Sequence, residues 1–177
     1  MLTDPENYSY DYTKQLINDI EDEETRQIAC LLYGTGARVS ESREILVKDI
    51  INQDKEDGNS YLVIRCPVFK KHDNQSHFRQ APIRMDEDWL IKPIIKLRDE
   101  VAVNGNLTPL VTWHRVTIFR KLVKALNINP HGFRKLRATH LATKFKFNET
   151  KLVAFFDWTD GRPAYVYAKA NLEDIMY

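Results

Sequence analysis

Cysteine, glycine and proline are scarce in this sequence, which holds two cysteines, six glycines and seven prolines among 177 residues. No internal repeat or low-complexity tract is visible. Cys30 and Cys66 are widely separated and neither lies in a CxxC pair, which predicts two reduced, structural thiols in an intracellular protein. A disulfide between them is the lesser alternative.

Long hydrophobic runs are also missing. The longest apolar stretches, such as IACLLY at 28–33, are far too short to cross a bilayer. No basic start followed by an apolar segment appears, so the sequence does not indicate secretion. A hydrophobic content of 43% and a charged content of 29% are typical of a globular protein. The length suits one domain, with two very small domains as the lesser alternative. We expect a single intracellular domain, residues 1–177, with no membrane partner.

Acidic residues are missing from one long stretch, although the net charge of the chain is only +1. Residues 1–60 hold 14 acidic and 6 basic residues, whereas residues 61–177 hold 11 acidic and 20 basic residues. Between Val101 and Asn148 there are nine Lys or Arg and no Asp or Glu. A short basic run is usually a solvated surface, but a stretch of this length favours an anionic partner.

The patterning that is present is mostly helical, with one β-hairpin. β-branched and aromatic residues at 61–71, with a returning segment at 78–83, predict the hairpin after a turn at 54–60. The sequence therefore predicts an α+β fold that is mainly α-helical with a small antiparallel sheet. The segments expected to be helical are 12–20, 22–34, 86–103, 113–126, 130–144, 149–156 and 162–170.

Glycine and proline mark where elements should end or bend. Gly34 is expected to cap the second helix, and a turn through Gly36 should start another helix within 35–46. Pro67 suggests a strand edge or a bulge. Pro93 should break or kink the helix at 86–103.

His131 and Arg134 are three residues apart at the start of an expected helix. Asn129 is a good N-cap and Pro130 a good first-turn residue, so both side chains share a face beside free backbone N–H groups. A guanidinium matches two phosphate oxygens, and an imidazole adds a hydrogen bond or moves a proton. The pair predicts a phosphate site, although in isolation a surface helix with a fortuitous histidine would be the simpler interpretation.

Two further segments supply residues of the same kind. In LLYGTGARVSES, Arg38 follows a glycine turn and Glu41 comes one helical turn later, which suggests a phosphate clamp held by a carboxylate. In FFDWTDGRPAYVYAK, at 155–169, Trp158 precedes Tyr167 by nine residues. A tyrosine hydroxyl, with a pKa of about 10, is a weak nucleophile that needs cationic neighbours and a base.

Taken in order, these segments resemble the catalytic domain of tyrosine recombinases, the phage-integrase family, which includes archaeal virus and plasmid integrases. The resemblance covers about residues 12 to 170. TGARVSE resembles the box of the first arginine and its supporting acid, and HGFRKLRATHLA resembles the His-x-x-Arg box. FFDWTDGRPAYVYAK resembles the final box, whose His or Trp precedes the nucleophile by nine residues, which selects Tyr167 over Tyr165.

The resemblance implies an enzyme that cleaves and rejoins DNA through a 3′-phosphotyrosine, without metal or cofactor. Tyr167 would attack the scissile phosphate, Lys71 would protonate the leaving 5′-oxygen, and His131 would take the tyrosine proton. The residues implied to surround the phosphate are Arg38, His131, Arg134 and Trp158.

This sequence departs from the family pattern at three places. Trp158 stands where many members have His, so it can donate a hydrogen bond but cannot relay a proton. Lys135 replaces the frequent His after the second arginine. The hairpin is longer than usual and leaves Lys70 and Lys71 both available; Lys71 is preferred because an apolar pair resembling the family's precedes it.

The resemblance also implies partners and leaves alternatives open. We expect double-stranded DNA target sites, a homotetramer on DNA and a monomer without it, acting in integration or excision of a viral or mobile genome. The family's amino-terminal DNA-clamping domain is not expected within residues 1–177, so a fragment is favoured over a minimal natural protein. The rival functions are a type IB topoisomerase-like relaxing enzyme and a DNA-binding regulator that has lost cleavage.

The remaining basic and histidine side chains carry weaker expectations. Four bases either contact backbone phosphates or are only solvated: Arg115, Arg120, Lys121 and Lys124. Four histidines are expected to have no catalytic part: His72, His77, His114 and His140.

Overall fold

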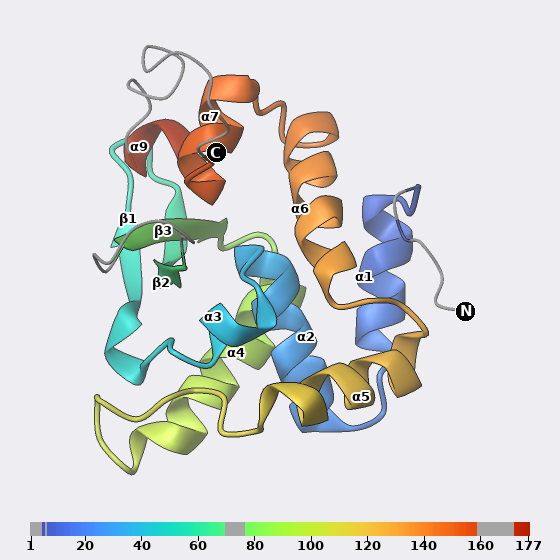
Figure 1. The fold of residues 1–177 in the computed structure, drawn as a ribbon. Coiled ribbons are helices and arrows are strands. Elements are labelled where there is room, and N and C mark those ends of the chain that lie inside the picture. Colours follow the sequence, from blue (N-terminus) through green and yellow to red (C-terminus); the bar gives the residue numbers. More distant parts are fainter. Residues whose placement is uncertain (1–4, 6, 70–76, 159–171) are drawn as a thin grey trace.

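The computed structural model describes residues 5, 7–69, 77–158 and 172–177, and shows a small sheet beside a set of helices (Figure 1). This confirms the predicted mainly helical α+β fold with a small antiparallel sheet. The helix expected at 162–170 lies outside the described residues. In chain order the elements are α1 (Tyr10–Asn18), α2 (Glu23–Thr35), α3 (Val39–Ser42), η1 (Val47–Asp49), β1 (Ile50–Asp54), β2 (Ser60–Val68), β3 (His77–Arg84), α4 (Asp88–Ala102), α5 (Arg115–Leu126), α6 (His131–Thr143), α7 (Glu149–Phe156) and α9 (Leu172–Ile175).

Helix α2 lies at the centre of the fold and packs against α1, α3, α4, α5, α6 and β3 (Figure 1). It begins after Asp22, whose side chain accepts a hydrogen bond from the backbone N–H of Thr25 at 3.0 Å. Two glutamates in its first turn complement the positive end of the helix dipole. Ten of its thirteen residues are buried, so α2 is the helix around which the others assemble.

The end of α2 differs from the expectation at Gly34. The helix continues to Thr35 and ends at Gly36, which has φ +65° and is the true C-cap. Gly34 instead lies inside the helix, where an added Cβ would be 2.7 Å from Ile83 Cδ1 on β3. The helix expected within 35–46 is much shorter than the segment, because α3 has four residues and is followed by the 3₁₀ turn η1.

The predicted hairpin is confirmed, with β2 and β3 paired antiparallel from Tyr61↔Arg84 to Val68↔His77. Pro67 lies in β2 beyond the part that pairs with β1, so the strand has a single neighbour there, as a proline position requires. The sequence did not predict β1, which pairs with β2 in the register Ile50↔Ile64. Its polar segment IINQD has little of the composition that marks a strand.

Of the break or kink expected at Pro93, the break is wrong, because α4 runs without interruption through this residue. A proline in a helix removes the hydrogen bond to the carbonyl four residues earlier, which here belongs to Trp89. That carbonyl instead faces the thiol of Cys30 on α2, with Sγ 3.7 Å from the oxygen. Contact with α2 therefore gives the freed carbonyl a partner.

Both cysteines are buried and free, as the sequence predicted. Burial raises the pKa of the Cys30 thiol to about 12 and that of Cys66 to about 11, so both remain protonated at neutral pH. No helix among the described residues has the length and apolar content needed to cross a membrane.

Candidate functional site

The site is built around the turn at Gly36, where α2 meets the end of α7. A Cβ at Gly36 would lie 2.3 Å from Cε1 of Phe156, the last residue of α7. The position therefore needs glycine both for its left-handed conformation and for this close approach. Arg38, the first predicted site residue, comes two residues later, so the turn fixes its place at the edge of the core.

Arg38 is held by Glu41, the residue predicted to be its supporting acid. The buried carboxylate of Glu41 accepts hydrogen bonds from the backbone N–H of Arg38 at 2.9 Å and from its Nη1 at 3.2 Å. It accepts a third from the backbone N–H of Phe69 at 3.0 Å. The side chain of Arg38 remains 45% exposed. Glu41 thus ties the Arg38 turn to the end of β2, next to the two candidate lysines Lys70 and Lys71, which lie outside the described residues.

Arg134, on the second turn of α6, reaches the same turn from the other side. Its Nη1 donates to the carbonyl of Gly36 at 2.7 Å and its Nη2 to that of Phe156 at 3.5 Å. Its guanidinium carbon lies 5.0 Å from the centre of the Phe156 ring. Burial, together with the nearby charges of Arg79 and Arg38, lowers the pKa of Arg134 to about 10. A bound anion would relieve the repulsion among these cations.

Trp158 follows the last residue of α7 by two positions. Its ring stacks on that of Phe156, with the centroids 4.8 Å apart and an interplanar angle of 13°. Phe156 therefore contacts Gly36, Arg134 and Trp158 together, and links three of the predicted boxes. Tyr167 and the alternative Tyr165 lie outside the described residues.

His131 is exposed at the first position of α6, and its backbone N–H donates to Oδ1 of Asn129 at 3.0 Å. The helix was expected to start one residue earlier; Pro130 is the N-cap and Asn129 still supplies a capping oxygen. His131 lines a surface pocket of about 240 Å³ that includes Val39 and Ser40, the two residues after Arg38. The pocket also contains Arg115, Val116 and Phe119 of α5.

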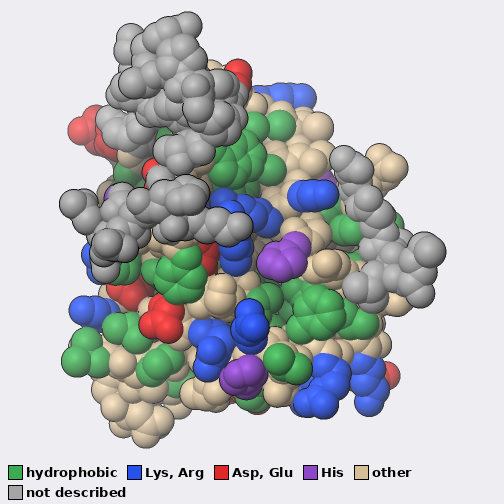
Figure 2. Space-filling view, in the orientation of Figure 1, with side chains coloured by type: hydrophobic (Ala, Val, Ile, Leu, Met, Phe, Trp, Pro, Cys, Tyr) green, Lys and Arg blue, Asp and Glu red, His purple; other side chains and the backbone are tan. Residues whose placement is uncertain are grey.

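Basic and histidine side chains gather on the face that carries this site. In Figure 2, Lys, Arg and His side chains lie across the centre and lower part of the view, with few acidic side chains among them. On α5, Arg115, Arg120, Lys121 and Lys124 are all exposed. Lys121 also lies over the Trp113 ring, with Nζ 4.5 Å from its centre. Helix α5, which lies in the stretch of sequence without acidic residues, thus presents its basic side chains to solvent.

The sequence interpretation missed Arg79 on β3. This residue is only 5% exposed, and its guanidinium donates to the carbonyls of Thr35 and Phe155. Arg79, Ala81 and Ile83 are all buried and share one face of the strand. A charged residue is unusual on the buried face of a strand whose side chains alternate between core and solvent. The place of Arg79 in this alternation, on the same face as Ala81 and Ile83, is the signal that could have revealed it.

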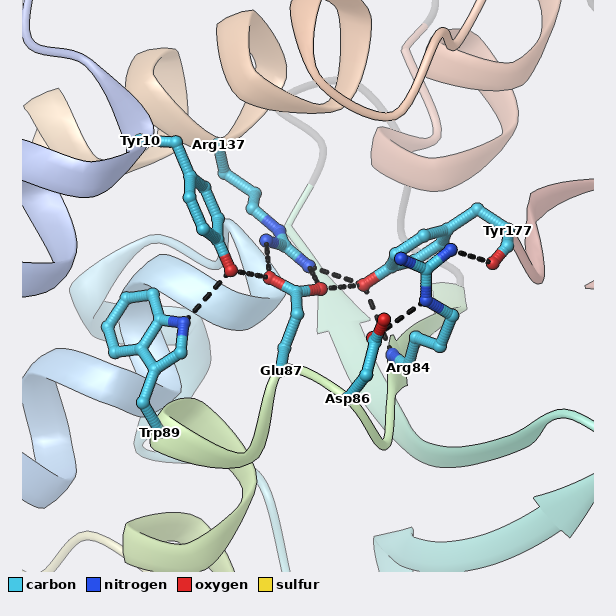
Figure 3. A network of polar contacts seen from close by, with 7 residues as sticks. All are labelled: Tyr10, Arg84, Asp86, Glu87, Trp89, Arg137 and Tyr177. Carbon is cyan, nitrogen blue, oxygen red and sulfur yellow. Dashed lines mark hydrogen bonds and ion pairs between the residues drawn. The ribbon is translucent and has the colours of Figure 1, made fainter.

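A second polar cluster lies in the core and is centred on Glu87 (Figure 3). Arg137 is completely buried and donates to both carboxylate oxygens of Glu87, at 2.8 and 3.0 Å. The Tyr10 hydroxyl donates to Glu87 at 2.9 Å and accepts from Trp89 Nε1 at 2.9 Å, and the Tyr177 hydroxyl also donates to Glu87. Arg137 is therefore part of a hydrogen-bonded network in the core, whereas Arg134, one turn earlier on α6, lies at the site.

His140, expected to have no catalytic part, is also buried in the core. Its Nδ1 is 2.7 Å from the Tyr33 hydroxyl and its Nε2 is 2.8 Å from the Tyr8 carbonyl oxygen. Among the described residues no group of three or more His, Cys, Asp or Glu side chains is arranged to hold a metal ion.

Residues 9–173 match the family model described as the phage integrase family. The chain is 27% identical over 147 residues to the tyrosine recombinase XerA of Pyrococcus horikoshii, covering 77% of this chain and 47% of that protein. The chain therefore spans about half the length of this curated relative.

Two solved structures share its fold. One is the Tn1549 transposon integrase in complex with circular intermediate DNA, with a TM-score of 0.58 and 15% identity. The other is the same integrase in complex with transposon right end DNA, with a TM-score of 0.57 and 15% identity. Each comparison covers 97% of this chain and 64% of the integrase chain.

Proposed function

The chain belongs to the phage integrase family, and from this premise we propose that it is the catalytic domain of a tyrosine site-specific recombinase. The observation that carries the proposal is the meeting of Arg38 and Arg134 at one turn, although they come from separate boxes. Arg134 donates to the carbonyl of Gly36, two residues before Arg38, and its guanidinium lies over the Phe156 ring, which stacks on Trp158.

The arginines would bind and polarise the scissile phosphate. Arg38 offers a side chain that is nearly half exposed and oriented by Glu41, and Arg134 offers a guanidinium whose position is fixed by two carbonyls. Their charge would stabilise the additional negative charge that develops on the phosphate oxygens. Trp158 would donate a hydrogen bond to one of those oxygens.

The chemical step would be a transfer of the phosphoryl group from one oxygen to another. The Tyr167 oxygen forms a bond to phosphorus while the bond from phosphorus to the 5′-oxygen breaks, which leaves a 3′-phosphotyrosine and a free 5′-hydroxyl. His131 takes the tyrosine proton, and Lys71 gives a proton to the leaving 5′-oxygen. Attack by a 5′-hydroxyl from another strand reverses the step and rejoins the DNA without ATP.

The support for Tyr167 and Lys71 comes from their neighbours. Tyr167 stands nine residues after Trp158, in the pattern of the final box. Lys71 follows Phe69 by two residues, and the backbone of Phe69 is held by the same carboxylate that orients Arg38. Lys70 remains the alternative to Lys71.

Double-stranded DNA is the proposed partner. Arg115 of α5 lines the same pocket as His131, and the solved integrase of the same fold is bound to DNA in both of its structures. We further propose that recombination takes place in a homotetramer assembled on two DNA sites. The biological setting would be integration or excision of a viral or mobile genome.

Covalent trapping on supercoiled plasmid, in EDTA and without ATP, tests the proposal. We expect a denaturant-resistant protein–DNA adduct whose rate of formation falls by about a hundredfold or more in Arg134→Lys, because lysine keeps the charge but loses the planar fork. DNA binding without an adduct would instead indicate a regulator. An adduct with relaxation, but without exchange between matched sites, would indicate a topoisomerase.

A further inference from the structure

Arg79 bridges the two backbone segments that hold the site, side by side with Arg134. Its Nη2 donates to the carbonyl of Thr35 at 2.6 Å and its Nη1 to that of Phe155 at 2.8 Å. Arg134 donates to the next residue along each of these segments. The two guanidinium groups thus form consecutive bridges between the end of α2 and the end of α7.

All of these acceptors lie at helix C-termini. Thr35 is the last residue of α2 and Phe155 the penultimate residue of α7, so neither carbonyl has an acceptor role within its own helix. Such carbonyls carry partial negative charge at the end of the helix dipole, which favours a cation. One guanidinium, with several donors in a rigid plane, can satisfy two helix ends that an ammonium group could not span.

Burial of Arg79 costs desolvation free energy, because a charged guanidinium is removed from water. The residue is 5% exposed, and within the described residues no carboxylate is ion-paired with it. Its guanidinium carbon lies 5.6 Å from the centres of both the Phe155 and Phe156 rings. The carbonyls and rings around Arg79 thus hold a guanidinium in the core close to the site.

We propose that Arg79 is a positioning residue for DNA cleavage, which fixes the spacing between the Arg38 turn and the segment that ends in Trp158. This inference rests on the proposed function. Arg79 acts through Arg134 and does not touch the phosphate itself. Without the bridge, the carbonyls of Gly36 and Phe156 would separate and Arg134 would lose its fixed orientation.

The electrostatics agree with this placement. The charge of Arg79 is the largest contribution, after burial, to the lowered pKa of Arg134. The two cations are therefore close enough to repel each other, and they are held together by the carbonyls between them.

The test compares Arg79→Lys with Arg137→Lys, which alters another buried arginine of the core outside the site. Single-turnover adduct formation is measured with supercoiled plasmid in excess, and plasmid affinity and thermal unfolding are measured in parallel. We expect Arg79→Lys to bind plasmid within about twofold of the unmodified protein but to form adduct about tenfold to a hundredfold more slowly, because small displacements of a catalytic group cost this much. Arg137→Lys should lose stability but keep the rate per folded molecule.

Two results of the adduct assay would overturn the inference. One is an unchanged adduct rate in Arg79→Lys. The other is an equal loss of rate in both variants at matched stability, which would make Arg79 a general part of the core. If Arg79→Lys is unfolded in buffer, the comparison is repeated in trimethylamine N-oxide, which favours the folded state; a variant still unfolded there also overturns the inference.

A readout that does not depend on activity separates this inference from the proposed function. In nuclear magnetic resonance spectra, the guanidinium protons of Arg134 should give separate, slowly exchanging signals because its hydrogen bonds restrict rotation. These signals should collapse in Arg79→Lys and persist in Arg137→Lys. If the unmodified protein forms no adduct but the signals behave this way, the proposed chemistry is wrong and the positioning by Arg79 stands. If the signals persist in Arg79→Lys, the positioning is wrong.

Discussion

At the scale of single residues, the site depends on side chains that orient other side chains. Glu41 is buried, and its carboxylate accepts three hydrogen bonds that fix Arg38 and the strand end at Phe69. Phe156 has a similar role, since it limits residue 36 to glycine and stacks on Trp158. We expect these buried residues to hold Arg38 and Arg134 in a defined geometry for the proposed phosphate.

Replacement of Glu41 by alanine tests this dependence. The change leaves the backbone N–H of Phe69 and that of Arg38 without their acceptor, and we expect a loss of about 1–3 kcal/mol in the free energy of unfolding. Adduct formation should slow by about tenfold or more, because Arg38 loses its orientation. Urea titration and single-turnover trapping give the two values. Glu44→Ala, at an exposed position close by, is the control, and an equal effect of both changes would contradict the role of Glu41.

At the scale of elements, the sequence predicted those parts whose signals are local. Helical periodicity located α2, α4, α5, α6 and α7, and the composition of 61–71 and 78–83 located the hairpin. The strand β1 was missed because it is short and polar, and is a strand only because β2 lies beside it. Where α4 runs through Pro93, the carbonyl freed by the proline faces the thiol of Cys30, a contact between distant segments that periodicity cannot reveal.

In the candidate site, too, residues with a local sequence signal were predicted and a residue defined by contacts between distant segments was missed. The boxes that contain Arg38, His131 and Arg134 could be recognised because their spacing along the chain is characteristic. Arg79 was not recognised, because its partners are backbone carbonyls of α2 and α7 and its strand carries no motif. Residues that act through the backbone of other segments leave little trace in one sequence.

Helix α5 carries a prediction of its own. If its exposed bases contact DNA phosphates, Arg120→Gln and Lys124→Gln should each make the slope of log affinity against log salt shallower by about 0.9. Fluorescence anisotropy with a short duplex at several salt concentrations measures this slope. Lys92→Gln, on an exposed part of α4 where Lys92 is paired with Asp88, removes the same charge elsewhere and should leave the slope unchanged. An unchanged slope in the α5 variants would mean that these bases are only solvated.

At the scale of the whole molecule, the Glu87 cluster joins the two ends of the described chain. Tyr10 of α1 and Tyr177 both donate to Glu87, which also pairs with Arg137 of α6 (Figure 3). Burial by itself raises the pKa of Glu87, but the charge of Arg137 and the hydrogen bonds to the carboxylate outweigh it, so the pKa is lowered. The cluster therefore stabilises the fold only while Glu87 is ionised.

This cluster predicts how stability depends on pH. The contribution of Glu87 should be complete above its ordinary pKa of 4.5 and should be lost as the pH falls through its lower folded-state pKa. Glu87→Gln should lower the free energy of unfolding at neutral pH by about 3–5 kcal/mol, since Arg137 is left as an unpaired buried charge. The variant should also lose less stability than the unmodified protein on acidification. Urea titrations across this pH range decide the point, and parallel pH curves for the two proteins would contradict it.

The most direct measurement is the identity of the residue that becomes joined to DNA. Adducts trapped on supercoiled plasmid are digested with nuclease and protease, and the modified peptide is located by mass spectrometry, with Tyr167→Phe and Tyr165→Phe in parallel. We predict a phosphotyrosine at Tyr167 that is absent in Tyr167→Phe and present in Tyr165→Phe. A modification at Tyr165, or an adduct that persists in Tyr167→Phe, would contradict the assignment of the nucleophile to a site built around Arg38 and Arg134.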